Sequence, residues 1–135
     1  MKKLSNVFLL IGEILMIVDM VSCFLAAVTI FIMAAPFATE PVRDAIIASA
    51  GESLPVAELD LIISSYQISM IVSGAITALS IIPMGFAASF AHKTRNDGSG
   101  NNIVATLVFA YLCGANIMLA GAILGLISHL KENRE

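Results

Sequence analysis

Asp19 is the residue of this sequence whose type and position are best suited to chemistry. It lies in a long apolar run, from Leu4 to Phe37, in which Glu13 is the only other charged residue. An ionised carboxylate deep in a bilayer costs about 2.5–3.5 kcal/mol on insertion scales. We therefore expect Asp19 to be protonated and hydrogen-bonded, to bind a proton or cation in a polar cavity, or to pair with a basic residue of a partner or second copy. The plainer alternative is a neutral polar residue that is satisfied at a helix contact.

Three further polar side chains are predicted to reach the same depth as Asp19. Ser73 and Thr77 belong to a second apolar run, and Asn116 lies near the middle of a third. Transport and assembly sites inside membranes are built from such layers of polar groups. Glu13 is a candidate second acid, but at 100° per residue it lies about a third of a turn from Asp19. The two acids therefore need not act as a pair.

Small residues in the second and third apolar runs are predicted to mediate helix packing. Small side chains let two membrane helices approach closely, and serine hydroxyls can also hydrogen-bond across the contact. A water-filled ion path is the alternative for the serine row. The predicted packing residues are Ser65, Ser69, Gly85, Gly114, Gly121 and Gly125.

The sequence contains no recognisable catalytic or metal-binding motif. It has no His–carboxylate pattern, nucleophile elbow or phosphate-binding loop. Cys23 and Cys113 lie within apolar runs, and His92 and His129 lie at span ends, where histidine commonly anchors a helix at the interface. We predict a protein that is not an enzyme and has no metal or cofactor. The two small basic clusters also argue against nucleic-acid binding.

The helices that position these residues are predicted from three long apolar runs. Leu61–Ala91 and Ile103–Leu130 contain no Asp, Glu, Lys or Arg, and each exceeds the roughly 20 residues needed to cross a bilayer. Mean hydropathy is +0.94, which leaves too little polar material to cover a water-soluble core. We expect one all-α domain over residues 1–135, an integral membrane bundle of three long transmembrane helices at about 5–35, 57–91 and 102–130.

Proline and glycine predict where the helices end. Pro36 is expected to stop the first helix, and Pro83 to kink the second near the cytoplasmic face. Between the first two spans, Pro41 and Gly51 suit the first turn and the end of a short amphipathic helix. We expect this helix to lie on the outer membrane surface in an external segment, 39–56, with a solvated loop as the alternative.

The distribution of charge predicts the orientation in the cell membrane. The N-terminus and the loop at 92–101 each carry two Lys or Arg residues, whereas the segment from Thr39 to Asp60 holds five acids against one arginine. Positively charged loops stay in the cytoplasm. The N-terminus and that loop are therefore expected inside, and with three spans the C-terminus is expected outside. Lys131 and Arg134 would suit the cytoplasm equally well.

The closing stretch from Asn116 to Leu126 is rich in alanine and glycine. It resembles the final helix of small uncharacterised bacterial multi-span membrane proteins. The resemblance implies a bacterial origin and no known activity. Some members of such families use four spans with both ends in the cytoplasm, whereas the residues from Ile103 to Leu130 are too few for two crossings.

The predicted function is that of an accessory or self-assembling subunit of a membrane complex. Asp19 and the small-residue helix faces would mediate assembly within the lipid bilayer, with a second copy or with a larger membrane protein. Proton- or cation-coupled transport or channel activity centred on Asp19 is the alternative. A holin-like or immunity protein is a further alternative.

Overall fold

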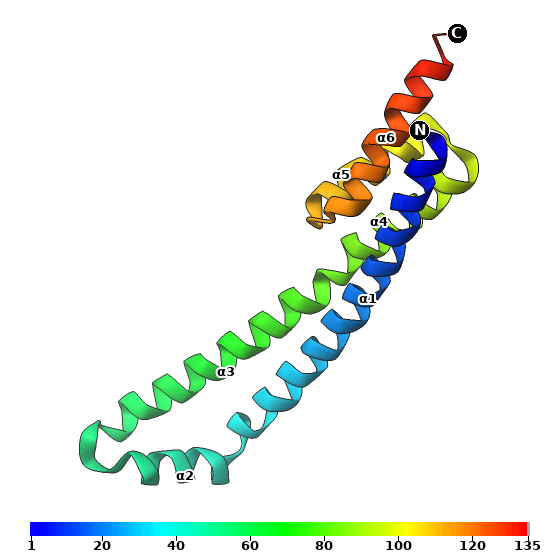
Figure 1. Cartoon of the computed structure of the whole chain (residues 1–135). Helices are drawn as coiled ribbons and strands as arrows, with labels where there is room; N and C mark the ends of the chain where they lie inside the picture. The colour runs from blue at the N-terminus through cyan, green and yellow to red at the C-terminus, as the bar shows by residue number, and fades with distance from the viewer. Residues whose placement is uncertain (135) are drawn as a thin grey trace. The chain divides into compact units, whose positions relative to one another are not determined.

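The computed structural model describes residues 1–134, and for Glu52 the backbone only. The described residues form helices and no strand, which confirms the expected all-α class (Figure 1). The chain divides into two units, which are described separately: the first joins residues 1–22 to residues 80 and onward, and the second holds residues 23–79. The elements are α1 (Lys2–Ala34), η1 (Ala35–Ala38), α2 (Glu40–Ala50), η2 (Gly51–Ser53), α3 (Val56–Leu79), α4 (Ile81–Asp97), α5 (Gly100–Leu112) and α6 (Asn116–Glu132).

Two helical stretches, Lys2–Ala38 and Val56–Asp97, are long and apolar enough to cross a membrane. Their boundaries follow local backbone chemistry. α1 gives way to a 3-10 turn that has Pro36 in its first turn. The interruption predicted near Pro83 is observed, because α3 ends at Leu79. A proline ring clashes with the carbonyl four residues earlier and lacks the amide proton that would continue the helix.

The short helix predicted between the first two spans is present as α2. Pro41 lies in its first turn, and Gly51 ends it with a φ of +62° that suits glycine. α2 is tied to α3 by Arg43, which forms an ion pair with Asp60 and donates a hydrogen bond to Ser64 Oγ at 3.0 Å.

The second unit packs the last turns of α1 against α3 in antiparallel order. The ring of Phe37 meets that of Tyr66 edge to face, with centroids 5.3 Å apart. Nearer the C-terminal end of α3, a Cβ on Gly74 would lie 3.1 Å from the ring of Phe31. The absence of a side chain at this glycine therefore lets the two helices approach closely.

The prediction of one continuous helix over about 102–130 is wrong. α5 and α6 instead lie side by side as an antiparallel hairpin (Figure 1). At about 1.5 Å per residue, α5 is about 20 Å long and α6 about 26 Å, both less than the roughly 30 Å of a hydrocarbon core. Over the described part of the chain, only the two stretches above have the length and apolarity of a span.

The hairpin turn is built by Gly114 in the left-handed conformation, with a φ of +67°. The N–H of Gly114 donates to the carbonyl of Tyr111 at 3.1 Å, and the N–H of Ala115 donates to the carbonyl of Ala110 at 2.9 Å. This pair of bonds is the Schellman motif that ends many helices. The N–H of Asn116 then donates to the carbonyl of Gly114 at 3.0 Å, and α6 begins.

Substituting Gly114 by alanine will lower the free energy of unfolding by about 1–2 kcal/mol, because an L-residue in this conformation brings Cβ too close to its own backbone. Asparagine tolerates the left-handed region better, so Gly114→Asn will cost less than Gly114→Ala. Unfolding by SDS in mixed micelles, followed by circular dichroism, measures both variants. Equal stability of the alanine variant and the native protein would contradict the assigned role of the turn.

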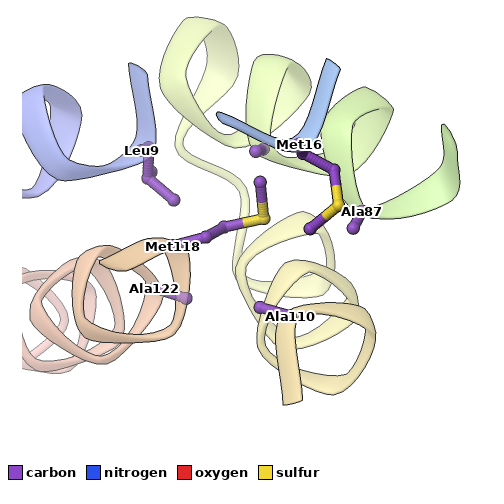
Figure 2. Packing of buried hydrophobic residues seen from close by; sticks show 7 residues of the cluster. Leu9, Met16, Ala87, Ala110, Met118 and Ala122 are labelled. Carbon is purple, nitrogen blue, oxygen red and sulfur yellow. The ribbon is translucent and has the colours of Figure 1, made fainter. Parts of the chain in front are cut away.

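In the first unit, α6 runs antiparallel to the first half of α1. Gly12 lies against Met118, and Gly121 lies against Leu9. The hydroxyl of Ser5 donates to the carbonyl of Gly121 at 2.8 Å and is buried. Figure 2 shows the apolar core that forms between these helices and α4 and α5, with the two methionines pointing into it. The core consists of Leu9, Met16, Ala87, Ala91, Ala110, Met118 and Ala122.

α4 and α5 are joined by a buried threonine pair and by stacked phenylalanines. The hydroxyl of Thr106 donates to the carbonyl of Asn102 at 2.8 Å, so its only proton is used there. The hydroxyl of Thr94 must therefore be the donor in the 2.9 Å bond between the two threonines. Beside this pair, the rings of Phe90 and Phe109 stack with centroids 5.6 Å apart.

The start of α1 and the end of α6 lie at the same end of the first unit. Lys2 Nζ is 3.9 Å from Glu132 Oε1, and both residues line one small cavity together with Gly98 of the loop before α5. The expectation that the N-terminus and the C-terminus lie on opposite sides of the membrane depended on a third span. The hairpin removes that argument because α6 returns to the end from which α5 begins.

Candidate functional site

Asp19 and Asn116 line a single cavity of about 290 Å³ in the first unit, the Asp19 cavity. One wall is a face of α1, and the other is the tip of the α5–α6 hairpin. Folding the third apolar run back on itself places the first turn of α6 at the level of Asp19. The cavity is lined by Gly12, Leu15, Met16, Asp19, Gly114, Ala115, Asn116, Ile117 and Met118.

Asp19 is the only charged residue that lines this cavity. Its side chain is exposed, and among residues 1–134 it makes no hydrogen bond and no ion pair. The remaining lining is mostly apolar, with Leu15, Met16 and Ile117 around the acid. Within residues 1–134, the carboxyl group of Asp19 therefore lacks a counter-charge.

The other two residues of the predicted polar layer belong to the second unit. Thr77 donates its hydroxyl proton to the carbonyl of Ser73, one turn earlier in α3, at 2.8 Å. Ser73 itself is exposed. Of the four residues predicted for the layer, Asp19 and Asn116 are the two that share a described cavity.

Glu13 takes part in an ion cluster that the sequence interpretation missed. Its carboxylate lies 2.8 Å from Arg95 Nη2 and 3.1 Å from His92 Nδ1. The Asn96 amide nitrogen lies 3.1 Å from His92 Nε2, and Arg95 Nη2 lies 3.2 Å from His92 Nδ1. We call these four residues the Glu13 cluster. It joins α1 to α4.

The two acids of α1 thus have different surroundings. The side chain of Glu13 is 16% exposed and that of Arg95 is 22% exposed, so their ion pair is largely shielded from solvent. His92 and Arg95 are three residues apart and therefore lie on one face of α4. This spacing could have predicted that the two side chains share an acidic partner. That partner is far away in the sequence, and nothing local to the two residues identifies it.

The GxxxG pair of α6 lies at the contact with α1. A Cβ on Gly121 would be 2.9 Å from the backbone nitrogen of Leu9, and one on Gly125 would be 3.0 Å from Ser5 Oγ. The tightest approach involves Gly12, which the four-residue pattern did not include. A single glycine in an apolar helix does not by itself predict such a contact.

The other predicted packing residues have different roles. A Cβ on Gly85 would be 3.5 Å from Met20 Cε, which is an ordinary van der Waals distance. The packing role predicted for Gly114 is wrong, because a Cβ there would meet nothing within 4 Å and the residue serves the turn instead. Ser65 and Ser69 are exposed on α3. The buried side of α3 carries Leu59, Ile63 and Gly74.

No group of three or more His, Cys, Asp or Glu side chains within the described residues is arranged to hold a metal ion. Comparison with protein-family models gives no match, and comparisons with curated proteins and with solved structures give no significant match. The resemblance to small bacterial multi-span proteins therefore stays a prediction.

Proposed function

We propose that this chain is an integral membrane protein with two spans, Lys2–Ala38 and Val56–Asp97, and a hairpin that enters and leaves the bilayer on one side. The length and apolarity of the two stretches support the spans. The hairpin supports a common side for both chain ends. Six of the seven Lys and Arg residues belong to the first unit: Lys2, Lys3, Lys93, Arg95, Lys131 and Arg134.

This charge distribution supports an orientation with both chain ends in the cytoplasm. Positive charge near span ends stays on the cytoplasmic side. Arg43, the seventh cation, lies in the segment between the two proposed spans, where three acids, Glu40, Asp44 and Glu52, outnumber it. The cations at the end of α6, which suited the cytoplasm as well as an external C-terminus, agree with this arrangement.

Within the membrane, the protein acts as an assembly subunit, and the Asp19 cavity is where another membrane helix docks. The observation that carries this function is the unpaired carboxylate in an open, largely apolar cavity. Asp19 follows Glu13 by six residues, which places it about 9 Å further along the helix than the Glu13 cluster. An isolated charge at membrane depth costs about 2.5–3.5 kcal/mol. A hydrogen-bonding or charged group on a docking helix would offset that cost.

The exposed serines of α3 support assembly through a second surface. Ser65, Ser69 and Ser73 follow one another at four-residue spacing and are exposed. A row of small hydroxyl side chains lets a neighbouring helix approach closely and accept or donate hydrogen bonds. The buried side of α3 uses other residues, so this row is not consumed by packing within the second unit.

Asp19→Asn will weaken assembly, because the amide cannot form the ion pair or the charge-assisted hydrogen bond that the carboxylate forms. Native membranes holding the full-length protein would be treated with a lipid-permeable cross-linker and analysed on denaturing gels. The native protein is expected in products larger than the 14.2 kDa chain, and Asp19→Asn is expected mainly as the monomer.

Asp44→Asn is the matched control, because it removes an exposed acid from α2 in the other unit. Its cross-linked products should match those of the native protein. Circular dichroism would verify that both variants remain helical. If the native protein is recovered only as monomer, or if Asp19→Asn leaves the products unchanged, the assembly function is wrong.

A further inference from the structure

We propose that the Asp19 cavity receives a lysine or arginine side chain carried by a membrane helix of a different protein. The inference rests on the proposed assembly function and names the chemistry of the partner.

Asp19 is the one charged residue of the lining, and no described residue pairs with it. The same helix holds a second acid, Glu13, which is satisfied by Arg95 at 2.8 Å. A carboxylate in a weakly solvated setting is stabilised best by an opposite charge that also donates hydrogen bonds. The Asp19 cavity contains the acidic member of such an ion pair, and no basic residue lines it.

The lining of the Asp19 cavity suits a lysine or arginine side chain better than an inorganic cation. A bound inorganic cation such as Ca²⁺ or Mg²⁺ takes six or more oxygen ligands. Only Asp19 and Asn116 contribute polar side chains to this cavity, whereas Leu15, Met16 and Ile117 give it apolar walls. Lysine and arginine bring an apolar stem together with a charged head. The stem can pack on the walls while the head reaches the carboxylate.

A second copy of this chain is not the source of the base. α1 has no Lys or Arg after Lys3, and the runs Leu61–Ala91 and Ile103–Leu130 have none. Copies inserted by the same charge rule share one orientation, so their cations lie at the same level. The cation nearest in depth is Arg95, which pairs with Glu13, and Glu13 precedes Asp19 by about 9 Å along the helix. A second copy in that orientation therefore has no base at the depth of Asp19.

Several of the chain's cations are also engaged already. Arg95 pairs with Glu13, Lys2 lies 3.9 Å from Glu132, and Lys93 lies over the ring of Phe90 at 5.3 Å from its centroid. Arg43 pairs with an acid of α3 in the second unit. These pairings, together with the depth of the cations, favour another protein as the source of the charge complement of Asp19.

The test uses full-length protein in lipid nanodiscs and synthetic transmembrane peptides as probes. Each peptide is a leucine–alanine helix long enough to span, with lysine, glutamine or leucine at its central position. Energy transfer between a dye on the peptide and a dye on the protein gives the affinity. We expect the lysine peptide to bind about tenfold more tightly than the leucine peptide, as a close charge pair would provide.

Two variants show that the preference belongs to Asp19. Asp19→Asn should reduce the affinity of the lysine peptide to that of the leucine peptide. Asp19→Glu should retain most of the preference for the lysine peptide. Circular dichroism checks that each variant is folded. Binding of the glutamine peptide as tightly as the lysine peptide would overturn the proposal, since a neutral hydrogen bond would then suffice.

Other outcomes separate this inference from the assembly function. If cross-linking in membranes depends on Asp19 but the lysine peptide has no advantage, the partner chemistry is wrong and the assembly function stands. If the complexes that depend on Asp19 contain only copies of this chain, the partner inference is again wrong. If neither assay responds to Asp19→Asn, both proposals are wrong.

Discussion

Replacing Arg95 with methionine will lower the free energy of unfolding by about 3 kcal/mol, the lower end of the range for removing one partner of a buried ion pair. The substitution leaves Glu13 with His92 as its remaining partner, at 3.1 Å. Because the Glu13 side chain is only 16% exposed, water cannot fully replace the lost guanidinium. Methionine retains an apolar stem, so the effect reports mainly the charge. SDS-induced unfolding followed by circular dichroism measures it.

Lys2→Met is the matched control for this prediction. Lys2 Nζ lies 3.9 Å from Glu132 Oε1, and both side chains are largely exposed. Exposed ion pairs contribute between zero and about 1 kcal/mol, so this variant should be nearly as stable as the native protein. Combining Arg95→Met with Glu13→Gln should recover part of the loss, since the unpaired charge is then gone. If Arg95→Met costs no more than Lys2→Met, the Glu13 cluster does not stabilise the first unit.

Gly12→Ala will lower the free energy of unfolding by about 2 kcal/mol, within the range for overpacking a well-packed contact. A Cβ at this position would lie 2.6 Å from the Cβ of Met118 and 2.8 Å from its Cα. The Met118 side chain is fully buried in the core (Figure 2). The close atoms belong to the Cα–Cβ base of Met118, which a rotamer change cannot move, so α1 and α6 must separate. The gain of about 1 kcal/mol in helix propensity is too small to offset this.

Gly85→Ala tests whether the loss comes from the contact. Gly85 is also a helical glycine, and a Cβ there would lie 3.5 Å from the flexible end of Met20. We expect this variant to be as stable as the native protein or slightly more stable. Thermal unfolding in a mild detergent can rank the two variants side by side. A smaller loss for Gly12→Ala than for Gly85→Ala would mean that the contact between α1 and α6 is not tight.

Features that depend on a few neighbouring residues were predictable from the sequence. The turn after Ala34, the short helix that ends at Gly51 and the interruption before Pro83 are all present. Each follows from a missing amide proton, a steric clash or a left-handed glycine, and these effects act within about one helical turn. The two stretches that are long and apolar enough to cross a membrane were predictable because length and apolarity are properties of the sequence alone.

The hairpin illustrates where such reasoning fails. Gly114 fits equally well in a membrane helix, where small residues pack, and in a Schellman turn, where a positive φ is required. The apolar run around it is uninterrupted by charge, so it predicts one long helix. The bonds from Gly114 and Ala115 to the carbonyls of α5 show which alternative is adopted. That choice moves the end of α6 beside Lys2 and changes the expected side of the C-terminus.

The sequence by itself determined that the protein is helical, that α1 and α2 end near Pro36 and Gly51, and that α1 carries two acids in apolar surroundings. It did not predict that α4 continues to Asp97 through the expected loop at 92–101. Only the tertiary structure decided what those acids are for. Glu13 meets Arg95 across 82 positions of the chain, whereas Asp19, in the same helix, faces a cavity without a base. Two carboxyl side chains of the same helix therefore differ: Glu13 forms an ion pair, and Asp19 has no basic partner among the described residues. The physical reason is that an ion pair depends on distance in space, and folding sets that distance independently of separation along the chain.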